Sequence, residues 1–251
     1  MVWHPFFSEY KHYFPNLTLN EKNSPKIYIA SNFIIRALLL QIKKLFNPKA
    51  SWRPWHYLSA TSSEKILSEQ SFPQQKKFYL LEGWLFRDYI LFTKFQDQLR
   101  HLFSFSNEVT ARIEKEIQIL RGSSPSLMIG LHIRRGDYQF WQRGKYYYSD
   151  EQYISVIKNL IELFSARGIN VKILACSNEK ISTDSPINEI LTSHTLKSEI
   201  EDLCLLSHCD YILGPPSSFS SWASFIGKVP LLHIEDPDQQ FSLEQFKINS
   251  G

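Results

Sequence analysis

Residues 127–138 decide the fold, and they read Leu-Met-Ile-Gly-Leu-His-Ile-Arg-Arg-Gly-Asp-Tyr. The apolar residues of the first half, with a glycine and a histidine among them, predict a buried strand. The charged residues and the glycine after them predict a turn at the carboxyl end of that strand. Ligands of open α/β sheets bind beyond the carboxyl ends of the strands, so a candidate binding site lies at Arg134 and Arg135.

The residue types at this turn suit an anionic ligand. Arg134 and Arg135 carry planar, permanently charged groups that match the geometry of phosphate oxygens. Gly136 permits a sharp turn or a close approach of the backbone to a ligand, and Asp137 is placed to orient one guanidinium group or to cap the next element. Two alternatives stay open. An Arg-Arg pair is often a solvated surface feature, and His132 points either into the core or towards the site.

A second stretch, residues 210–227, reads Asp-Tyr-Ile-Leu-Gly-Pro-Pro-Ser-Ser-Phe-Ser-Ser-Trp-Ala-Ser-Phe-Ile-Gly. It predicts a strand that ends at Gly214, a rigid Pro-Pro turn and the start of a helix. A helix start offers unpaired backbone N–H groups and the positive end of a dipole, and it binds anions readily. Ser217, Ser218 and Ser220 add hydroxyl donors, although a simple N-cap role for one of the first two is the commoner explanation. Together with the arginines, this stretch favours a diphosphate ligand.

The chain around these stretches alternates strand and helix. Strands are predicted at 127–133, 171–175, 210–213 and 229–234, and helices begin at Ser149 and near residues 186, 198 and 218. This repetition predicts an α/β fold, a parallel sheet with helices on both faces. The turn-forming residues 121–126 are the best domain boundary, which gives domains 1–122 and 123–251.

Local signals define several elements further. Ser149-Asp150-Glu151-Gln152 has the form of a capping box, and Ser106 is expected to cap a helix over 107–121. Before that helix, the sequence predicts strands at 26–30 and 78–81, and helices at 32–46 and 88–102.

Composition indicates a globular protein of 251 residues with a mild formal charge of +3. It shows no basic stripe for nucleic acid, and its 3 cysteines are too few for a disulfide framework, which favours a reducing compartment. The most apolar early segment, residues 33–40, is too short to span a bilayer. We therefore expect a soluble, cytoplasmic protein that binds no nucleic acid and has no membrane span, with peripheral membrane association left open.

The two stretches resemble known motifs. His132 to Tyr138 matches the signature of the α-1,2-fucosyltransferase family and of related enzymes that use GDP-fucose. Residues 201–209 (Glu-Asp-Leu-Cys-Leu-Leu-Ser-His-Cys), with Ser-Ser-Phe-Ser at 217–220 and Trp-Ala at 222–223 after them, resemble the second motif of that family. Glu82-Gly83-Trp84, with Phe103-Ser104-Phe105 after it, is similar to the segment before the arginine motif. The resemblance covers about residues 78–234.

The resemblance implies a GT-B architecture, with an acceptor-side lobe at 1–122 and a Rossmann-like nucleotide-sugar-binding lobe at 123–251. It implies an inverting, metal-independent transfer of fucose from GDP-fucose to a glycan hydroxyl, in an α-1,2 linkage. It implies that Arg134 and Arg135 hold the diphosphate. From the residues themselves we predict catalytic roles for Arg134 and Asp137. The predicted donor-binding residues are His132, Arg134, Arg135, Gly136, Ser217, Ser218, Phe219 and Ser220. The Gly-Asn-Gln loop of the family does not occur in residues 1–60, so the N-terminal lobe is expected to be truncated or remodelled.

Three questions stay open at this point. Asp137 and Glu82 are the candidate bases that would deprotonate the acceptor, and the sequence does not choose between them. Asp236-Pro237-Asp238 spells a metal-binding signature of other glycosyltransferases, but its position after the last core strand favours a turn. Finally, the chain is either this transferase, a relative that uses another GDP-sugar or linkage, or a degenerate lobe that binds nucleotide or glycan without turnover.

Overall fold

The computed structural model describes residues 12–16, 55–60, 62–63, 65–66, 70, 78–83, 86–123, 126–192 and 198–249. The chain divides into two compact units. The first comprises residues 1–12, 16–102 and 251, and the second comprises residues 13–15 and 103–250. The predicted strand at 26–30 and helix at 32–46 lie outside the described residues.

In the first unit, two strand pairs precede two short helices. Strand β1 (Trp55–Ala60) pairs in parallel with β3 (Phe78–Gly83), and β2 (Lys65–Ile66) pairs in parallel with β4 (Phe86–Arg87). The strand predicted at 78–81 is thus confirmed. The helix predicted at 88–102 forms as α3 (Tyr89–Lys94) and α4 (Gln96–Leu102). Asp88 caps α3, because its side chain accepts a hydrogen bond from the Leu91 backbone at 2.8 Å.

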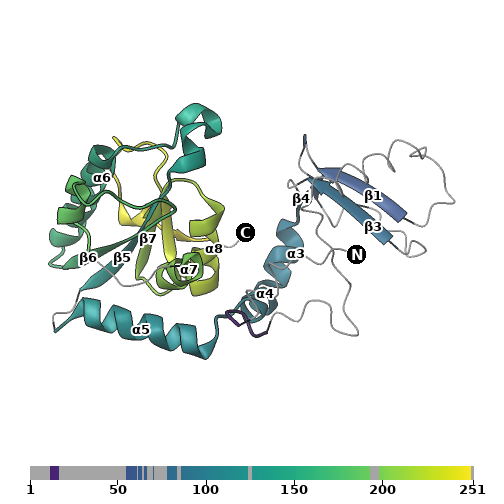
Figure 1. Ribbon diagram of the computed structural model, residues 1–251, viewed down its shortest axis with the longest axis horizontal. Coiled ribbons are helices and arrows are strands. Elements are labelled where there is room, and N and C mark those ends of the chain that lie inside the picture. The colour runs from purple at the N-terminus through teal and green to yellow at the C-terminus, as the bar shows by residue number, and fades with distance from the viewer. Residues whose placement is uncertain are drawn as a thin grey trace. The chain divides into compact units, whose positions relative to one another are not determined.

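The second unit is built on a five-stranded sheet in the order β6-β5-β7-β8-β9 (Figure 1). Its parallel strands are β5 (Leu127–Ile133), β6 (Val171–Ser177), β7 (Tyr211–Gly214) and β8 (Pro230–His233), and β9 (Lys247–Ile248) runs antiparallel at the edge. The predicted α/β class with a parallel sheet is confirmed. Because β5 lies between β6 and β7, it is an interior strand of the sheet, and every residue of it except Leu127 is buried.

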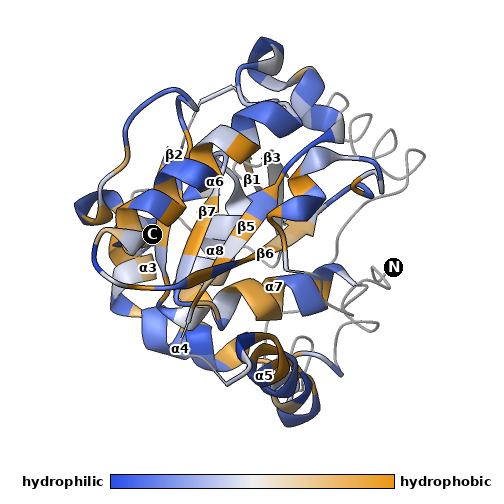
Figure 2. Ribbon diagram, turned by 90° about the vertical axis from the view of Figure 1, so that its left-hand side faces the viewer, coloured by the Kyte–Doolittle hydropathy of each residue, from blue (hydrophilic) through white to orange (hydrophobic). Residues whose placement is uncertain are grey.

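Helices cover both faces of this sheet, as predicted. Side chains alternate between the faces of a strand. Ile129, Leu131 and Ile133 therefore pack on one side with α6 (Asp150–Ser165), while Met128 packs on the other side with α5 (Asn107–Arg121) and α7 (Glu199–Ser207). Helix α8 (Ser218–Gly227) also covers this second face. Figure 2 shows apolar residues gathered on the strands and on the helix faces turned towards them.

Helix α5 belongs to the second unit. Its buried residues Val109, Ile113 and Ile117 pack in the same cluster as α7, and Arg121 at its end pairs with Asp210 at 2.6 Å. Ser106 caps it as predicted, since its side chain accepts from the Val109 backbone. The domain boundary predicted after residue 122 therefore falls inside the second unit, between α5 and β5. The chain passes from the first compact unit to the second between residues 102 and 103.

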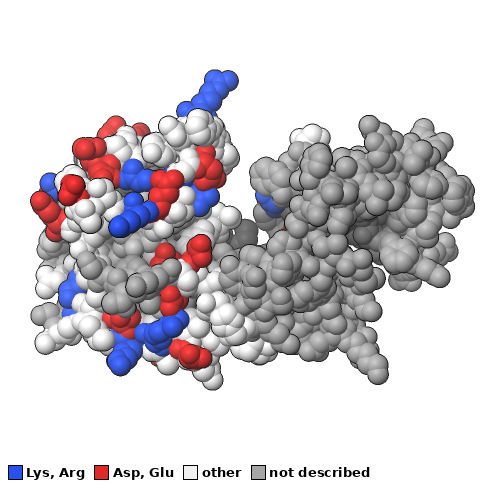
Figure 3. Space-filling model, in the orientation of Figure 1, with Lys and Arg blue, Asp and Glu red and all other residues white. Residues whose placement is uncertain are grey.

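Charge is mixed on one face of the second unit. Figure 3 shows Lys and Arg side chains interspersed with Asp and Glu over the face it draws. Attraction of an anion to this face would thus depend on individual residues more than on a broad field. Over the described ranges, none of the helices combines the length and the apolar character needed to cross a bilayer.

Candidate functional site

Arg134 leaves the sheet at the carboxyl end of β5. Its backbone N–H donates to the hydroxyl of Tyr153 at 3.3 Å, and its guanidinium group lies over the ring of Tyr138, 5.3 Å from the centroid. The guanidinium also pairs with Asp137 at 2.8 Å. The Arg134 side chain is 29% exposed and that of Asp137 is 63% exposed. A permanent positive charge therefore lies at the carboxyl end of β5, where a ligand can reach it.

Tyr138 connects the two predicted stretches. It lies in a short 3₁₀ helix, η1 (Gly136–Gln139), and its hydroxyl donates to the carbonyl oxygen of Pro216 at 2.6 Å. Burial raises the pKa of Tyr138, against the opposing effects of a hydrogen bond with Ser217 and of the Arg134 charge. The phenol thus stays protonated and keeps donating at neutral pH. The loop after β5 and the loop before α8 are adjacent, as the sequence predicted.

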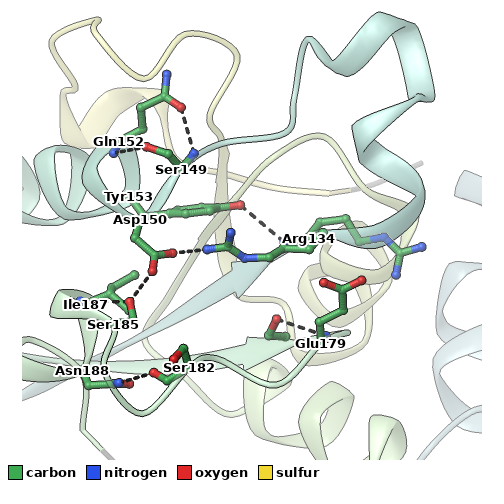
Figure 4. Close-up of polar contacts among 12 residues, drawn as sticks. Arg134, Ser149, Asp150, Gln152, Tyr153, Glu179, Ser182, Ser185, Ile187 and Asn188 are labelled. Carbon is green, nitrogen blue, oxygen red and sulfur yellow. Dashed lines mark hydrogen bonds and ion pairs between the residues drawn. The ribbon is translucent and has the colours of Figure 1, made fainter.

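Arg135 has quite different partners from Arg134. Its guanidinium pairs with the Asp150 carboxylate, and the two side chains are only 20% and 22% exposed. The other oxygen of Asp150 accepts a hydrogen bond from the Ser185 hydroxyl (Figure 4). The Arg135 backbone N–H donates to the Asn178 side chain at 2.7 Å, and the Asn178 amide donates back to the Arg135 carbonyl at 3.4 Å. The structure therefore places the two adjacent arginines in separate environments.

Gly136 adopts a conformation that other residues rarely take, with φ of +61°. A Cβ atom at this position would lie 3.0 Å from a carboxylate oxygen of Glu179 and 3.2 Å from the amide nitrogen of Asn178. Both the backbone angle and the close neighbours favour glycine. The arginine loop can consequently lie directly against the loop that comes after β6.

His132 is a buried residue of β5 whose side chain borders the site. Its pKa is lowered to about 4, mainly by burial and further by the charges of Arg134 and His233, so the ring is neutral at pH 7. Its ring packs against Phe219, with 5.1 Å between the centroids. Gly214 allows the close approach of the two strands here, because a Cβ there would lie 2.7 Å from the His132 carbonyl oxygen. Among the described residues, the buried Nδ1 atom of His132 has no hydrogen-bond partner.

The three serines at the start of α8 divide into different environments. Ser217 is the N-cap, and its hydroxyl accepts from the Phe219 backbone at 3.2 Å. Ser220 is fully buried and donates to the Ser217 carbonyl at 3.1 Å. Ser218 is exposed. The N-cap explanation is therefore confirmed for Ser217, and the binding of an anion by these residues stays a prediction.

Several residues of this arrangement do not emerge from the sequence. The sequence shows Asp150 only as part of a capping box, which is present: Ser149 and Gln152 bond each other reciprocally. The pairing of Asp150 with Arg135 spans two elements, as do the contacts of Asn178 and Ser185. The one available signal is that Asp150 is an acid at the start of the α-helix that follows the arginine loop.

The other carboxylates that the sequence singles out lie outside this arrangement. Asp236 accepts a hydrogen bond from the Asp238 backbone at 3.0 Å, so Asp236-Pro237-Asp238 forms the turn that the sequence favoured. Within the described ranges, no three His, Cys, Asp or Glu side chains are grouped to hold a metal ion. Glu82 lies in β3 of the first unit, and its side chain is outside the described residues.

Comparison with curated proteins finds galactoside alpha-(1,2)-fucosyltransferase 1 of Pan troglodytes, 26% identical over 220 residues, which cover 80% of this chain and 57% of that protein. The same enzyme of Homo sapiens is 25% identical over 213 residues, which cover 77% and 55%. The chain therefore spans little more than half the length of these relatives.

Among solved structures, fucosyltransferase NodZ from Bradyrhizobium is similar with a TM-score of 0.41 and 16% identity, covering 69% of this chain and 59% of that chain. A mutant of Arabidopsis thaliana FUT1 in complex with GDP gives 0.43 and 12%, covering 83% and 56%. The model of the family described as glycosyl transferase family 11 matches residues 43–249. This match takes in far more than half of the chain and both motif stretches, and the chain belongs to glycosyl transferase family 11.

Proposed function

We propose that this chain transfers fucose from GDP-fucose to a hydroxyl of a glycan acceptor, by an inverting, metal-independent reaction that forms an α-1,2 linkage. Family membership supports the reaction class, and the names of the curated relatives support the donor sugar and the linkage. The observation that carries the proposal is the position of Tyr138. Its ring lies under Arg134 and its hydroxyl is hydrogen-bonded to Pro216, so the Arg134 guanidinium and the start of α8 lie in one region.

Arg134 is the proposed ligand of the donor diphosphate. Its counterion Asp137 is mostly exposed, and such exposed pairs contribute only about 0–1 kcal/mol. A diphosphate can therefore compete for the guanidinium at little cost. The N-terminal end of α8 adds a positive dipole and backbone N–H groups on the neighbouring loop.

The proposed reaction breaks the bond between the anomeric carbon of fucose and the diphosphate oxygen, and the electron pair leaves with GDP. The acceptor oxygen forms the new bond to that carbon, and its proton passes to a base. Negative charge grows on the leaving diphosphate, where Arg134 and the α8 start would stabilise it. In enzymes that use preorganised donors in this way, removal of one donor costs about 3 kcal/mol of transition-state stabilisation.

Asp137 is better placed to orient Arg134 than to serve as the base. In an inverting displacement the attacking oxygen approaches the sugar from the face opposite to the leaving group. The Asp137 carboxylate contacts the residue proposed to hold the leaving group. We therefore propose an orienting role for Asp137, and Glu82 remains the candidate base from the sequence.

Calorimetric titration of the whole chain tests this proposal. GDP-fucose, GDP, GDP-mannose and a UDP-sugar would be titrated in the presence of a chelator, and GDP release from GDP-fucose would be followed separately. We expect GDP and GDP-fucose to bind selectively, and Arg134→Ala to abolish that binding. Arg167→Ala is the matched control, because Arg167 is exposed and its guanidinium donates to the Leu163 carbonyl in the last turn of α6.

The possible outcomes separate the hypotheses. Binding of GDP without release of GDP from GDP-fucose in the presence of acceptors would indicate a non-catalytic lobe. Binding that requires added Mn²⁺ would contradict the metal-independent mechanism and return attention to Asp236 and Asp238. Failure of the wild-type chain to bind any of the nucleotides would overturn the proposal.

A further inference from the structure

The carboxylate of Asp150 joins two segments that lie far apart in the sequence. One of its oxygens pairs with the Arg135 guanidinium, and the other accepts from the Ser185 hydroxyl. Asp150 lies in the first turn of α6, and Ser185 immediately precedes a 3₁₀ helix, η3 (Pro186–Glu189). Ser185 is itself held, since it is only 8% exposed and its hydroxyl also accepts from the Ile187 backbone. Asp150 is thus a fixed bridge between α6, η3 and the arginine loop.

The backbone of the arginine loop is held at the same place. Asn178 bonds both the N–H and the carbonyl group of Arg135, and the fully buried Tyr153 accepts from the N–H of Arg134. These contacts come from the loop after β6 and from α6. Residues 134 and 135 are therefore fixed through main chain and side chain together, while the Arg134 guanidinium extends away from Asp150 (Figure 4).

Charge and burial separate the two arginines. The Arg135 charge is neutralised by a carboxylate in a pair about one-fifth exposed, whereas the Arg134 charge is balanced by a carboxylate that is mostly exposed. Removing Arg135 from a partly buried pair to serve an anion would leave Asp150 without its counterion, which is costly. Drawing Arg134 away from Asp137 to bind the same anion costs little.

We propose that Arg135, Asp150 and Ser185 are positioning residues, which hold the loop so that Arg134 alone meets the diphosphate. This inference rests on the proposed function, because the anion is the donor named there. It deepens that function by giving the doubled arginine two tasks: one residue binds the anion and the other fixes its neighbour.

Asp150→Asn distinguishes this proposal from direct binding, because the two predict changes of opposite sign. If Arg135 bound the diphosphate directly, Asp150 would compete with it, and the neutral variant would bind GDP more tightly. If Asp150 positions the loop, its neutralisation releases the Arg135 side chain and weakens GDP binding. We expect a loss of about tenfold in GDP affinity, the equivalent of one charge-assisted hydrogen bond.

Ser185→Ala repeats the test without any change of charge. The positioning role predicts a loss of about fivefold in GDP affinity, the equivalent of one net hydrogen bond, and direct binding by Arg135 predicts none. Ser182→Ala is the matched control in the same loop, since Ser182 is exposed and its hydroxyl accepts a local hydrogen bond from the Asp184 backbone. Its affinity should equal that of the wild type.

Amide hydrogen exchange of the protein without nucleotide gives an independent measurement. Asp150→Asn and Ser185→Ala should speed exchange at residues 134–138, and Ser182→Ala should not. If the wild type binds no GDP, the proposed function fails, while the exchange data still decide the positioning role. Tighter GDP binding by Asp150→Asn, or unchanged exchange in both variants, would overturn the inference.

Discussion

The hydroxyl of Tyr138 and the carbonyl oxygen of Pro216 are joined by a hydrogen bond of 2.6 Å, although 78 residues separate them in the sequence. The bond links the loop after β5 to the turn that opens α8, and Arg134 lies over the same ring. A single side chain thus sets the spacing between the cation and the helix start.

Tyr138→Phe should weaken GDP binding with only a modest loss of stability. The net contribution of one such hydrogen bond to the free energy of unfolding is about 1 kcal/mol, while the ring that supports Arg134 is retained. Titration calorimetry and urea unfolding measure the two effects. Tyr147→Phe is the control, because Tyr147 is 37% exposed in the next loop. Equal GDP affinity in wild type and Tyr138→Phe would show that the bond does not set this spacing.

Gly136→Ala should destabilise the protein and weaken GDP binding. The positive φ of Gly136 costs a residue with a side chain about 1 kcal/mol, and the new Cβ would also press on Glu179 and Asn178. Gly168 has a φ of +70° with no atom within 4 Å of the added Cβ. Gly168→Ala therefore measures the cost of the backbone angle alone.

The comparison of these two variants by urea unfolding isolates the effect of the close neighbours. We expect the larger loss of unfolding free energy for Gly136→Ala, and a loss of GDP affinity for that variant only. Equal losses of stability in both would mean that the loop moves to accommodate the methyl group.

His132 predicts a loss of stability in mild acid. Its folded-state pKa is about 4, lowered from the ordinary value of 6.5 chiefly by burial. Between these values the unfolded chain binds a proton that the folded chain does not bind. The contribution of His132 to the free energy of unfolding is therefore complete above pH 6.5 and is lost as the pH falls towards 4, by about 3 kcal/mol in all.

His132→Asn should flatten the decline in unfolding free energy between about pH 7 and pH 4, measured by urea unfolding at each pH. Burial also lowers the pKa of His233, so a smaller decline of the same sign should remain. A decline as steep in the variant as in the wild type would assign the acid sensitivity to other groups.

The features predicted correctly follow either from a local pattern or from a general rule of α/β folds. The apolar run of β5 and the Ser149–Gln152 capping box are local patterns, and the covering of both sheet faces follows from the order of the elements. The meeting of the two loops follows from a general rule: the carboxyl ends of parallel strands lie on the same side of the sheet. The pairing of Arg135 with Asp150 did not follow, because nothing local distinguishes Arg135 from Arg134.

The position of α5 also depends on contacts between distant segments, which the sequence does not predict. Its stripe of Val109, Ile113 and Ile117 indicated that one face packs on a core, but not on which one. The contact with Asp210, far along the chain, joins it to the second unit. Strand β9 was not predicted, because two residues are too few to show a period.

The short strand β9 has a consequence for how copies of this protein behave in solution. It pairs with β8 over two residues, and Asn249 just after it bonds the Ser224 hydroxyl and the Ser221 carbonyl. The edge strand on this side of the sheet is therefore short and carries a lysine, Lys247. Long, flat, uncharged edge strands pair with strands of other molecules. A short, charged edge strand offers an incoming strand few hydrogen-bond partners, so concentrated solutions should resist aggregation through this side of the sheet.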